Sequence, residues 1–289
     1  MRLPLIFVAG LFAALGPSLA AAQTLTDQQI TDEMAKMHWT RGPANATLPM
    51  SKSLLALPDG YVLVTGAEAQ RFEFLNGGPN DTTIEAVALK SDVTERIIYV
   101  YVADGFVSAD DWGDVDATAL LQAVTENTAK ANEERRKRNI DEVHVTGWIQ
   151  KPTFDSKSET AFWAIGASTG SSPGVNSIAL RLGRYGYEKL TWVVTAAGYK
   201  AVGGGLDLML RAHSFAPGAQ YSEHVSTDKV AGYTLASLVA VVAGAKLAKV
   251  AGIGALLLLL KKFGIVIVSA GVGVLAWIKS LLSRKPKSS

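Results

Sequence analysis

Cysteine is absent from the 289-residue chain, which excludes disulfide bridges, thiol catalysis and zinc sites with cysteine ligands. Histidine is scarce as well, with four residues at positions 38, 144, 213 and 224. Their spacing matches neither HExxH nor another metal-binding motif. We therefore expect each histidine to be a lone surface or core residue, and we predict no metal or cofactor.

Acidic residues are absent from both ends of the chain. All 26 lie between Gln23 and Asp228, whereas ten of the 28 basic residues are Arg2 and the nine Lys/Arg of residues 229–289. The middle of the chain therefore carries a net charge near −8 and the apolar C-terminal tail is basic. Although residues 135–138 form a basic cluster, the acidic body argues against a nucleic-acid partner.

The N-terminus has the pattern of a secretory signal. Arg2 precedes an apolar run from Leu3 to Leu15, which is too short for a membrane span, and small residues follow a Gly-Pro break. We expect residues 1–22 to be a signal peptide cleaved after Ala22, with cleavage after Ala20 as the alternative. Residues 23–228 would then form an extracytoplasmic domain.

The tail, residues 229–289, predicts a membrane anchor. Phe263 to Leu282 is an apolar stretch of spanning length, and the basic residues 283–289 after it should stay in the cytoplasm. Residues 233–260 are also apolar, but Lys246 and Lys249 would each oppose insertion by roughly 2.5–3.5 kcal/mol. We expect an interfacial or re-entrant helix there, and a hairpin of two spans remains the alternative.

Small residues recur at every fourth position in the first part of the tail, a spacing that lets helices approach closely. They are Ala236, Ala240, Gly244, Ala248 and Gly252. This pattern predicts a homo-oligomer through the small-residue helix face.

The body combines strand and helix patterns. Expected strands are residues 48–57, 61–64, 84–89, 96–102, 143–149, 161–168, 177–182 and 190–195, with a hairpin turn at residues 58–60. Helices are expected after Thr26, after Thr65 with a capping box to Glu68, from Ala117 to Ala131, and over 206–212. This order predicts an α+β fold, a mainly antiparallel sheet with packed helices, plus a C-terminal transmembrane helix.

Several short motifs occur together in one order. They are residues 57–61 (LPDGY), 105–107 (GFV) with Asp110-Asp111, 147–148 (GW), Pro152 with 154–155 (FD), Asn176 with 182–186 (LGRYG), and 227–229 (TDK). Together they resemble a family of bacterial membrane-anchored proteins known as a domain of unknown function, although Phe154 stands where we would expect tyrosine. The resemblance covers nearly the whole mature chain and implies an envelope protein anchored by its C-terminus. It implies no activity.

Ser168 is the one candidate nucleophile. Residues 166–170 match the G-x-S-x-G elbow, with Asp207 and His213 later in the chain, but the elbow needs a helix after the serine. The next residues, Ser-Ser-Pro-Gly, favour a strand-turn-strand instead.

An acidic loop is the candidate cation site. Asp104, Asp110, Asp111, Asp114 and Asp116 lie close together in the sequence, but their spacing fails the EF-hand pattern. We expect Asp114 or Asp116 to cap the following helix instead.

These observations predict a single-pass protein of the bacterial inner membrane, with most of the chain in the periplasm. Its expected role is structural or binding rather than enzymatic, with an envelope protein or the cell wall as partner. The alternatives are a hydrolase that uses Ser168 and an ion-binding sensor that uses the 104–116 loop.

Overall fold

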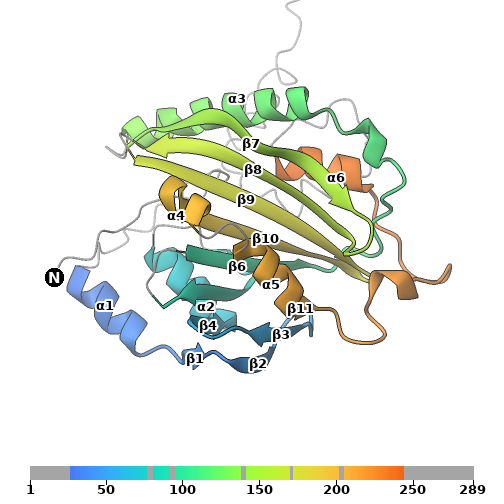
Figure 1. The fold of residues 1–289 in the computed structure, drawn as a ribbon, viewed down its shortest axis with the longest axis horizontal. Coiled ribbons are helices and arrows are strands. Elements are labelled where there is room, and N and C mark those ends of the chain that lie inside the picture. Colours follow the sequence, from blue (N-terminus) through green and yellow to red (C-terminus); the bar gives the residue numbers. More distant parts are fainter. Residues whose placement is uncertain are drawn as a thin grey trace, which may run out of the picture.

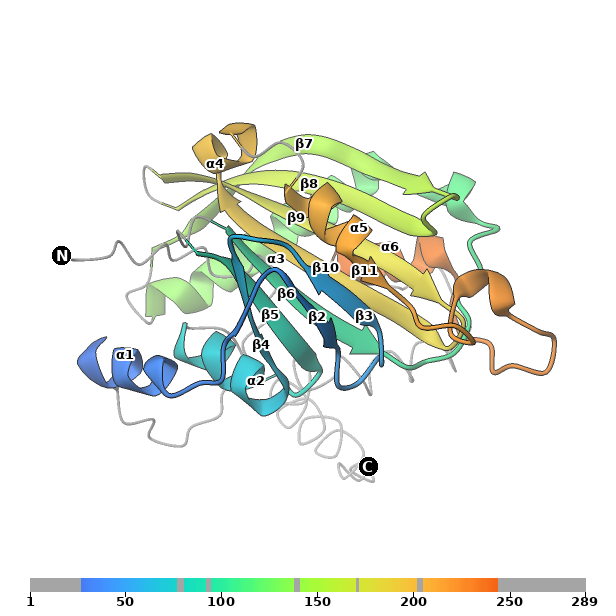
Figure 2. The same ribbon diagram turned by 60° about the horizontal axis from the view of Figure 1, so that its bottom comes forward.

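The computed structural model describes residues 27–76, 81–91, 95–137, 141–169, 172–201 and 205–243, and its architecture is three-layered. A large antiparallel sheet forms the middle layer (Figures 1 and 2). Helices cover one of its faces, and a small sheet with two short helices covers the other. The mostly antiparallel α+β prediction is therefore confirmed.

The large sheet has eight strands in the order β1-β4-β5-β6-β10-β9-β8-β7. Their bounds are β1 (Thr40–Arg41), β4 (Tyr61–Thr65), β5 (Ile84–Lys90), β6 (Glu95–Val102), β7 (Val143–Asp155), β8 (Thr160–Thr169), β9 (Ser172–Gly183) and β10 (Gly186–Thr195). The central strands are buried on both faces because both outer layers pack against them. This is why β5 is apolar without alternation from Ala86 to Leu89, whereas β10 carries Glu188, Lys189 and Thr191 among its apolar residues.

The helical face is covered by α1 (Asp27–Ala35), α2 (Gly66–Leu75), α3 (Ala117–Lys137) and α6 (Leu235–Val242). Figure 1 shows α3 running along β7 at the edge of the sheet. Leu120 and Val124 of α3 and Leu238 of α6 are among the residues that join the core on this side. A short 3₁₀ helix, η1 (Trp112–Asp114), precedes α3.

The other face is covered by a three-stranded sheet of order β11-β3-β2, seen in front of the large sheet in Figure 2. Its strands are β2 (Ala44–Thr47), β3 (Leu54–Leu57) and β11 (His213–Ser214). The helix α5 (Gly205–Ala212) packs beside it, and α4 (Ala196–Ala201) covers part of β9 and β10 on the same face of the large sheet. A second 3₁₀ helix, η2 (Tyr221–Glu223), lies in the segment that leads to α6.

The predicted hairpin at residues 58–60 is wrong, although the turn itself forms. Gly60 has the positive φ of a turn glycine, but β3 pairs with β2 and β11 in the small sheet, whereas β4 pairs with β1 and β5 in the large sheet. The turn therefore carries the chain from one layer to the other. Turn chemistry predicts the reversal of the chain, but the pairing of each strand depends on distant partners.

The predicted capping box of α2 is not formed, although Thr65 is its N-cap residue. The Glu68 carboxylate accepts a hydrogen bond from the backbone N–H of His38, at 2.9 Å, and meets its ring Nδ1 at 2.8 Å. A tertiary contact has replaced the local one.

The described packing does not end at Asp228, the expected domain boundary. Leu235, Leu238 and Val239 of α6 have an exposed fraction of 0% and belong to the core. The first part of the segment expected to lie along the membrane therefore packs inside the domain up to Ala243.

None of the helices in the described part of the chain combines the length and the apolar character of a membrane span. The expected span at residues 263–282, the signal peptide and the basic tail all lie outside the described residues. Ala236 and Ala240 of the small-residue face belong to α6 and are partly buried in the domain, and the other three members lie outside the described residues.

Candidate functional site

The C-terminal segment is held at one corner of the domain, which we call the junction: residues 104–111, 182–186 and 218–236. Phe106 donates its N–H to the carbonyl of Lys229 and accepts from the N–H of Ala231, both at 2.8 Å. Leu235 then donates to the carbonyl of Ser108 at 2.8 Å. The chain that leads to α6 is therefore hydrogen-bonded to the loop after β6 at three points.

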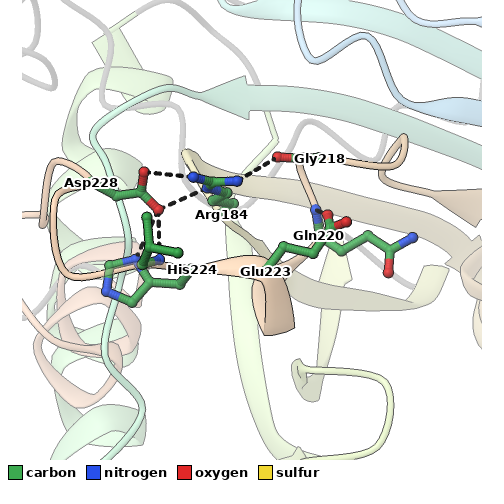
Figure 3. A network of polar contacts seen from close by, with 7 residues as sticks. Arg184, Gly218, Gln220, Glu223, His224 and Asp228 are labelled. Atoms are coloured by element: carbon green, nitrogen blue, oxygen red, sulfur yellow. Dashed lines mark hydrogen bonds and ion pairs between the residues drawn. The ribbon is translucent and has the colours of Figure 1, made fainter.

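Arg184 and Asp228 form the central ion pair of the junction (Figure 3). Arg184 lies at the β9–β10 turn, and its Nε and Nη2 donate to the two oxygens of Asp228 at 2.7 and 2.9 Å. Such two-pronged pairs fix orientation as well as charge. The hydrogen bonds from Arg184, with one from the N–H of Val225, lower the pKa of Asp228 to about 2. His224 Nδ1 lies 3.3 Å from the same carboxylate.

Aromatic rings pack beside this ion pair. The ring of Phe106 stacks on His224 with centroids 3.7 Å apart and on Tyr221 with centroids 4.5 Å apart. The Tyr221 hydroxyl donates to the carbonyl of Val107 at 3.0 Å. Glu223 accepts from the N–H of Gln220 at 2.8 Å, which closes the η2 turn that carries Tyr221.

Two glycines allow the backbones to approach closely at the junction. A Cβ at Gly105 would lie 2.4 Å from the carbonyl oxygen of Lys229, and Gly105 has a φ of +106°. A Cβ at Gly186 would lie 1.9 Å from the carbonyl oxygen of Val102. Both glycines belong to the motifs that carry the family resemblance. Glycine is required at these two positions for a steric reason, because a side chain would push the paired segments apart.

The acidic loop holds α6 in place. Tyr233 donates its hydroxyl to Asp104 at 2.7 Å, and Asp111 accepts from the hydroxyl of Thr234 and, at 3.3 Å, from the N–H of Ala236. Asp111 thus supplies a carboxylate to the N-terminus of α6, where backbone N–H groups lack partners and the dipole favours negative charge. Sequence reasoning missed this role, because Asp111 and α6 are more than a hundred residues apart.

The remaining loop carboxylates have local roles. Asp116 accepts from the N–H groups of Thr118 and Ala119 at 2.8 and 3.1 Å, which confirms the predicted cap of α3. Asp110 accepts from the hydroxyl of Ser108 at 2.8 Å, and Asp114 lies in η1. Within the described part of the chain, no group of three or more acidic or histidine side chains has the arrangement of a metal site.

Ser168 lies in β8, between His144 of β7 and Pro173 of β9 in the sheet register. β8 ends at Thr169 and the antiparallel β9 begins at Ser172, so the predicted strand-turn-strand is confirmed. The strand-to-helix turn of a nucleophile elbow is not formed.

The proposed partner His213 lies elsewhere, beside Glu188. Glu188 is level with Arg181 and Thr160 in the sheet register, and Thr160 is eight residues before Ser168 on β8. At 3.3 Å per residue that separation is about 26 Å. The structure therefore does not bring Ser168 and His213 together, and Asp207 is an exposed residue of α5.

Comparison with known proteins places these features in a family. No curated protein matches the chain. Among solved structures, the solution structure of cyanobacterial PsbP (CyanoP) from Synechocystis sp. PCC 6803 matches with 7% identity and a TM-score of 0.38, over 60% of this chain and 92% of that one. A TM-score this low establishes no shared fold. The family described as "Protein of unknown function (DUF2167)" matches residues 40–272, which include every segment of the junction, and the chain belongs to this family.

Proposed function

We propose that this protein is an anchored component of the bacterial envelope, with its α+β domain in the periplasm and a structural or binding role. In this proposal, residues 1–22 direct export and residues 263–282 cross the inner membrane. The junction then sets how the domain stands on its anchor. The proposed partner is an envelope protein or the cell wall.

The junction is the observation that carries this proposal. The first part of the tail, with Asp228 before it, is fixed by the Arg184–Asp228 pair, by backbone hydrogen bonds at Phe106 and by Asp111 at α6. A flexible tether would require none of these contacts. These contacts support the proposal that the domain is held in a defined position relative to its anchor.

Location is tested with reporters fused after Ser289 of the full chain. One span would leave a green fluorescent reporter active in the cytoplasm and alkaline phosphatase inactive, because the basic residues 283–289 prefer the cytoplasmic side. The reverse pattern would indicate a hairpin of two spans. A domain reporter at a position before Tyr233 that is active in the cytoplasm would contradict export altogether.

A non-enzymatic role is tested with Ser168→Ala. We expect this variant to complement a deletion strain fully and wild-type protein to resist labelling by a serine-directed fluorophosphonate. Labelling that disappears in the alanine variant would favour the hydrolase alternative. Crosslinking of the tagged full-length protein in intact membranes, followed by pull-down, would identify the partner.

A further inference from the structure

A buried polar cluster lies between the two sheets. Glu85 of β5, Glu188 of β10 and His213 of β11 all have an exposed fraction of 0%. His213 Nε2 is 3.9 Å from a carboxyl oxygen of Glu188, and the His213 ring stacks on Tyr99. Buried carboxyl groups are rare because a charge loses its hydration when it leaves water.

Several polar atoms of this cluster have no hydrogen-bond partner among the described residues. They are one carboxyl oxygen of Glu85, both ring nitrogens of His213 and the hydroxyl of Tyr99, while the Glu188 carboxyl faces Glu85 and Ser51. Unpaired buried polar atoms are costly, and each calls for a physical reason. Their concentration at one place between two layers indicates a role beyond packing.

The cluster connects the small sheet and α5 to the large sheet. The backbone N–H groups of Met50 and Ser51, in the β2–β3 loop, donate to Glu85 Oε2 at 2.7 and 2.9 Å. Arg181 of β9 donates to the carbonyl of Leu210 in α5. His213 itself belongs to the small sheet and reaches Glu188 of the large one. Any change of charge in the cluster therefore acts on the contact between the layers.

We propose that Glu85 and Glu188, the buried carboxyl pair, form a proton-dependent clamp between the two sheets. With a proton on Glu188, the pair is a carboxylate beside a neutral acid, and the layers stay together. When Glu188 loses that proton, two buried negative charges face each other, and the small sheet with the β2–β3 loop separates locally from the large sheet.

The chemistry of the surroundings agrees with this assignment. Burial raises the pKa of Glu188 well above its ordinary value of 4.5, and the neighbouring Glu85 raises it further. Two backbone N–H groups donate to Glu85, and the Glu188 carboxyl lies beside it. Two carboxyl groups that share a buried site cannot both ionise at low cost, which agrees with the raised pKa of Glu188.

Other titratable and charged groups face the pair from the packed elements. They are Arg181 from β9, His213 from β11, Tyr61 from β4, and Tyr99 and Tyr101 from β6. Burial, with a smaller contribution from the Arg181 guanidinium, lowers the pKa of His213 to about 3, so His213 is neutral when Glu188 titrates. Burial and the carboxyl pair raise the pKa of Tyr101, and burial and Glu188 raise that of Tyr99, so these two tyrosines keep their protons over the same range.

The sign of the pH effect follows from the raised pKa of Glu188. In the closed clamp Glu188 keeps its proton, whereas in the open state it ionises near 4.5. Opening therefore becomes about tenfold more favourable for each pH unit between 4.5 and the pKa of the closed state, and levels off above it.

Hydrogen exchange on the full-length protein, purified in detergent, tests the clamp between pH 5 and pH 9. The reporters are the amides of Met50, Ser51 and β3. Their exchange rates are converted to protection factors, so that the pH dependence of intrinsic, base-catalysed exchange cancels. The internal reference is the set of amides that join β8 to β9. We expect the reporter protection to fall by about tenfold per pH unit at first, while the reference stays constant.

Three variants complete the test. Glu188→Gln imitates the protonated acid and should abolish the pH dependence at the reporters. Glu85→Gln removes only the smaller contribution to the raised pKa of Glu188, so the pH dependence should persist but level off at a lower pH, and this variant serves if Glu188→Gln does not fold. Asp207→Asn, an exposed acid on α5, should leave the wild-type profile unchanged. Wild-type protection without pH dependence, or loss of protection in reporter and reference amides together, would overturn the proposal.

Discussion

At the scale of single residues, the junction depends on side chains that are absent as much as on those that are present. Gly105 lets the backbone of Lys229 come close enough for Phe106 to exchange hydrogen bonds with the C-terminal segment. Arg184 then fixes Asp228 from the other side. Loss of either feature should loosen the same segment.

Gly105→Ala should lower the free energy of unfolding by more than about 2 kcal/mol, because it adds a close contact to backbone strain. Gly147→Ala is the matched control, since Gly147 has a similar φ of +128° but a Cβ added there would meet no atom within 4 Å. Its cost should be about 1–2 kcal/mol, from strain alone. Urea unfolding followed by tryptophan fluorescence measures both, and equal costs would refute the role of the close contact.

At the scale of elements, carboxylates at helix N-termini connect distant parts of the chain. Asp116 stabilises α3 from the preceding residue, whereas Asp111 stabilises α6 from a loop far earlier in the sequence. The same chemistry therefore acts locally in one helix and between segments in the other.

Asp116→Ala should lower stability by about 0.5–2 kcal/mol, the usual effect of losing an N-cap side chain. Asp114→Ala should cost less than about 0.5 kcal/mol, because Asp116 and not Asp114 caps α3.

Millimolar Ca²⁺ should leave the melting temperature of the full-length protein unchanged. A rise of several degrees that disappears in the double variant Asp110→Ala, Asp111→Ala would show instead that the loop binds a cation.

Asp111→Ala should release α6 from the loop at a cost of about 1–2 kcal/mol, since it removes the acceptor for Thr234 and Ala236. Asp110→Ala is the control, because Asp110 bonds only to Ser108 within its own loop among the described contacts. Limited proteolysis is the measurement: cleavage between Lys229 and Ala243 should become faster in Asp111→Ala alone. Equal cleavage in both variants would contradict the capping role.

At the scale of the whole molecule, two buried groups between the layers make stability depend on pH in opposite directions. Burial, with a smaller contribution from Arg181, lowers the pKa of His213 to about 3. His213 therefore contributes stability above its ordinary pKa of 6.5, and that contribution is lost as pH falls toward 3. Glu188, with its raised pKa, contributes below 4.5 and weakens the fold as pH rises.

His213→Phe should flatten the acid side of the stability profile. Below pH 6.5, His213 should lower the wild-type free energy of unfolding by up to about 1.4 kcal/mol per pH unit. The reason is that His213 binds a proton in the unfolded chain but stays neutral when it is buried in the fold. His144→Phe, at an exposed position, is the control and should keep the wild-type slope. Urea midpoints from pH 4 to pH 7 measure the slopes, and identical slopes for the wild type and His213→Phe would exclude this linkage.

Local patterns in the sequence determined much of this protein. The sequence predicted the apolar strands at residues 84–89 and 96–102, the amphipathic helix from Ala117 and a cap by Asp114 or Asp116, because each depends on neighbours a few residues away. The structure shows that Asp116 is the cap. The α+β class and the family resemblance were readable for the same reason. The strand-turn-strand around Ser168 was predicted from the turn residues that follow it.

Only the tertiary structure decided which segments meet. β3 and β4 flank a well-formed turn but belong to different sheets. Glu68 accepts a hydrogen bond from His38 instead of forming the predicted capping box. The segment after Asp228 packs into the core although its apolar composition is equally suited to a membrane surface. Burial free energy depends on the surface that a residue meets, and local periodicity does not contain that information. The pairings of Arg184 with Asp228 and of Asp111 with α6 therefore appear only once the chain is folded.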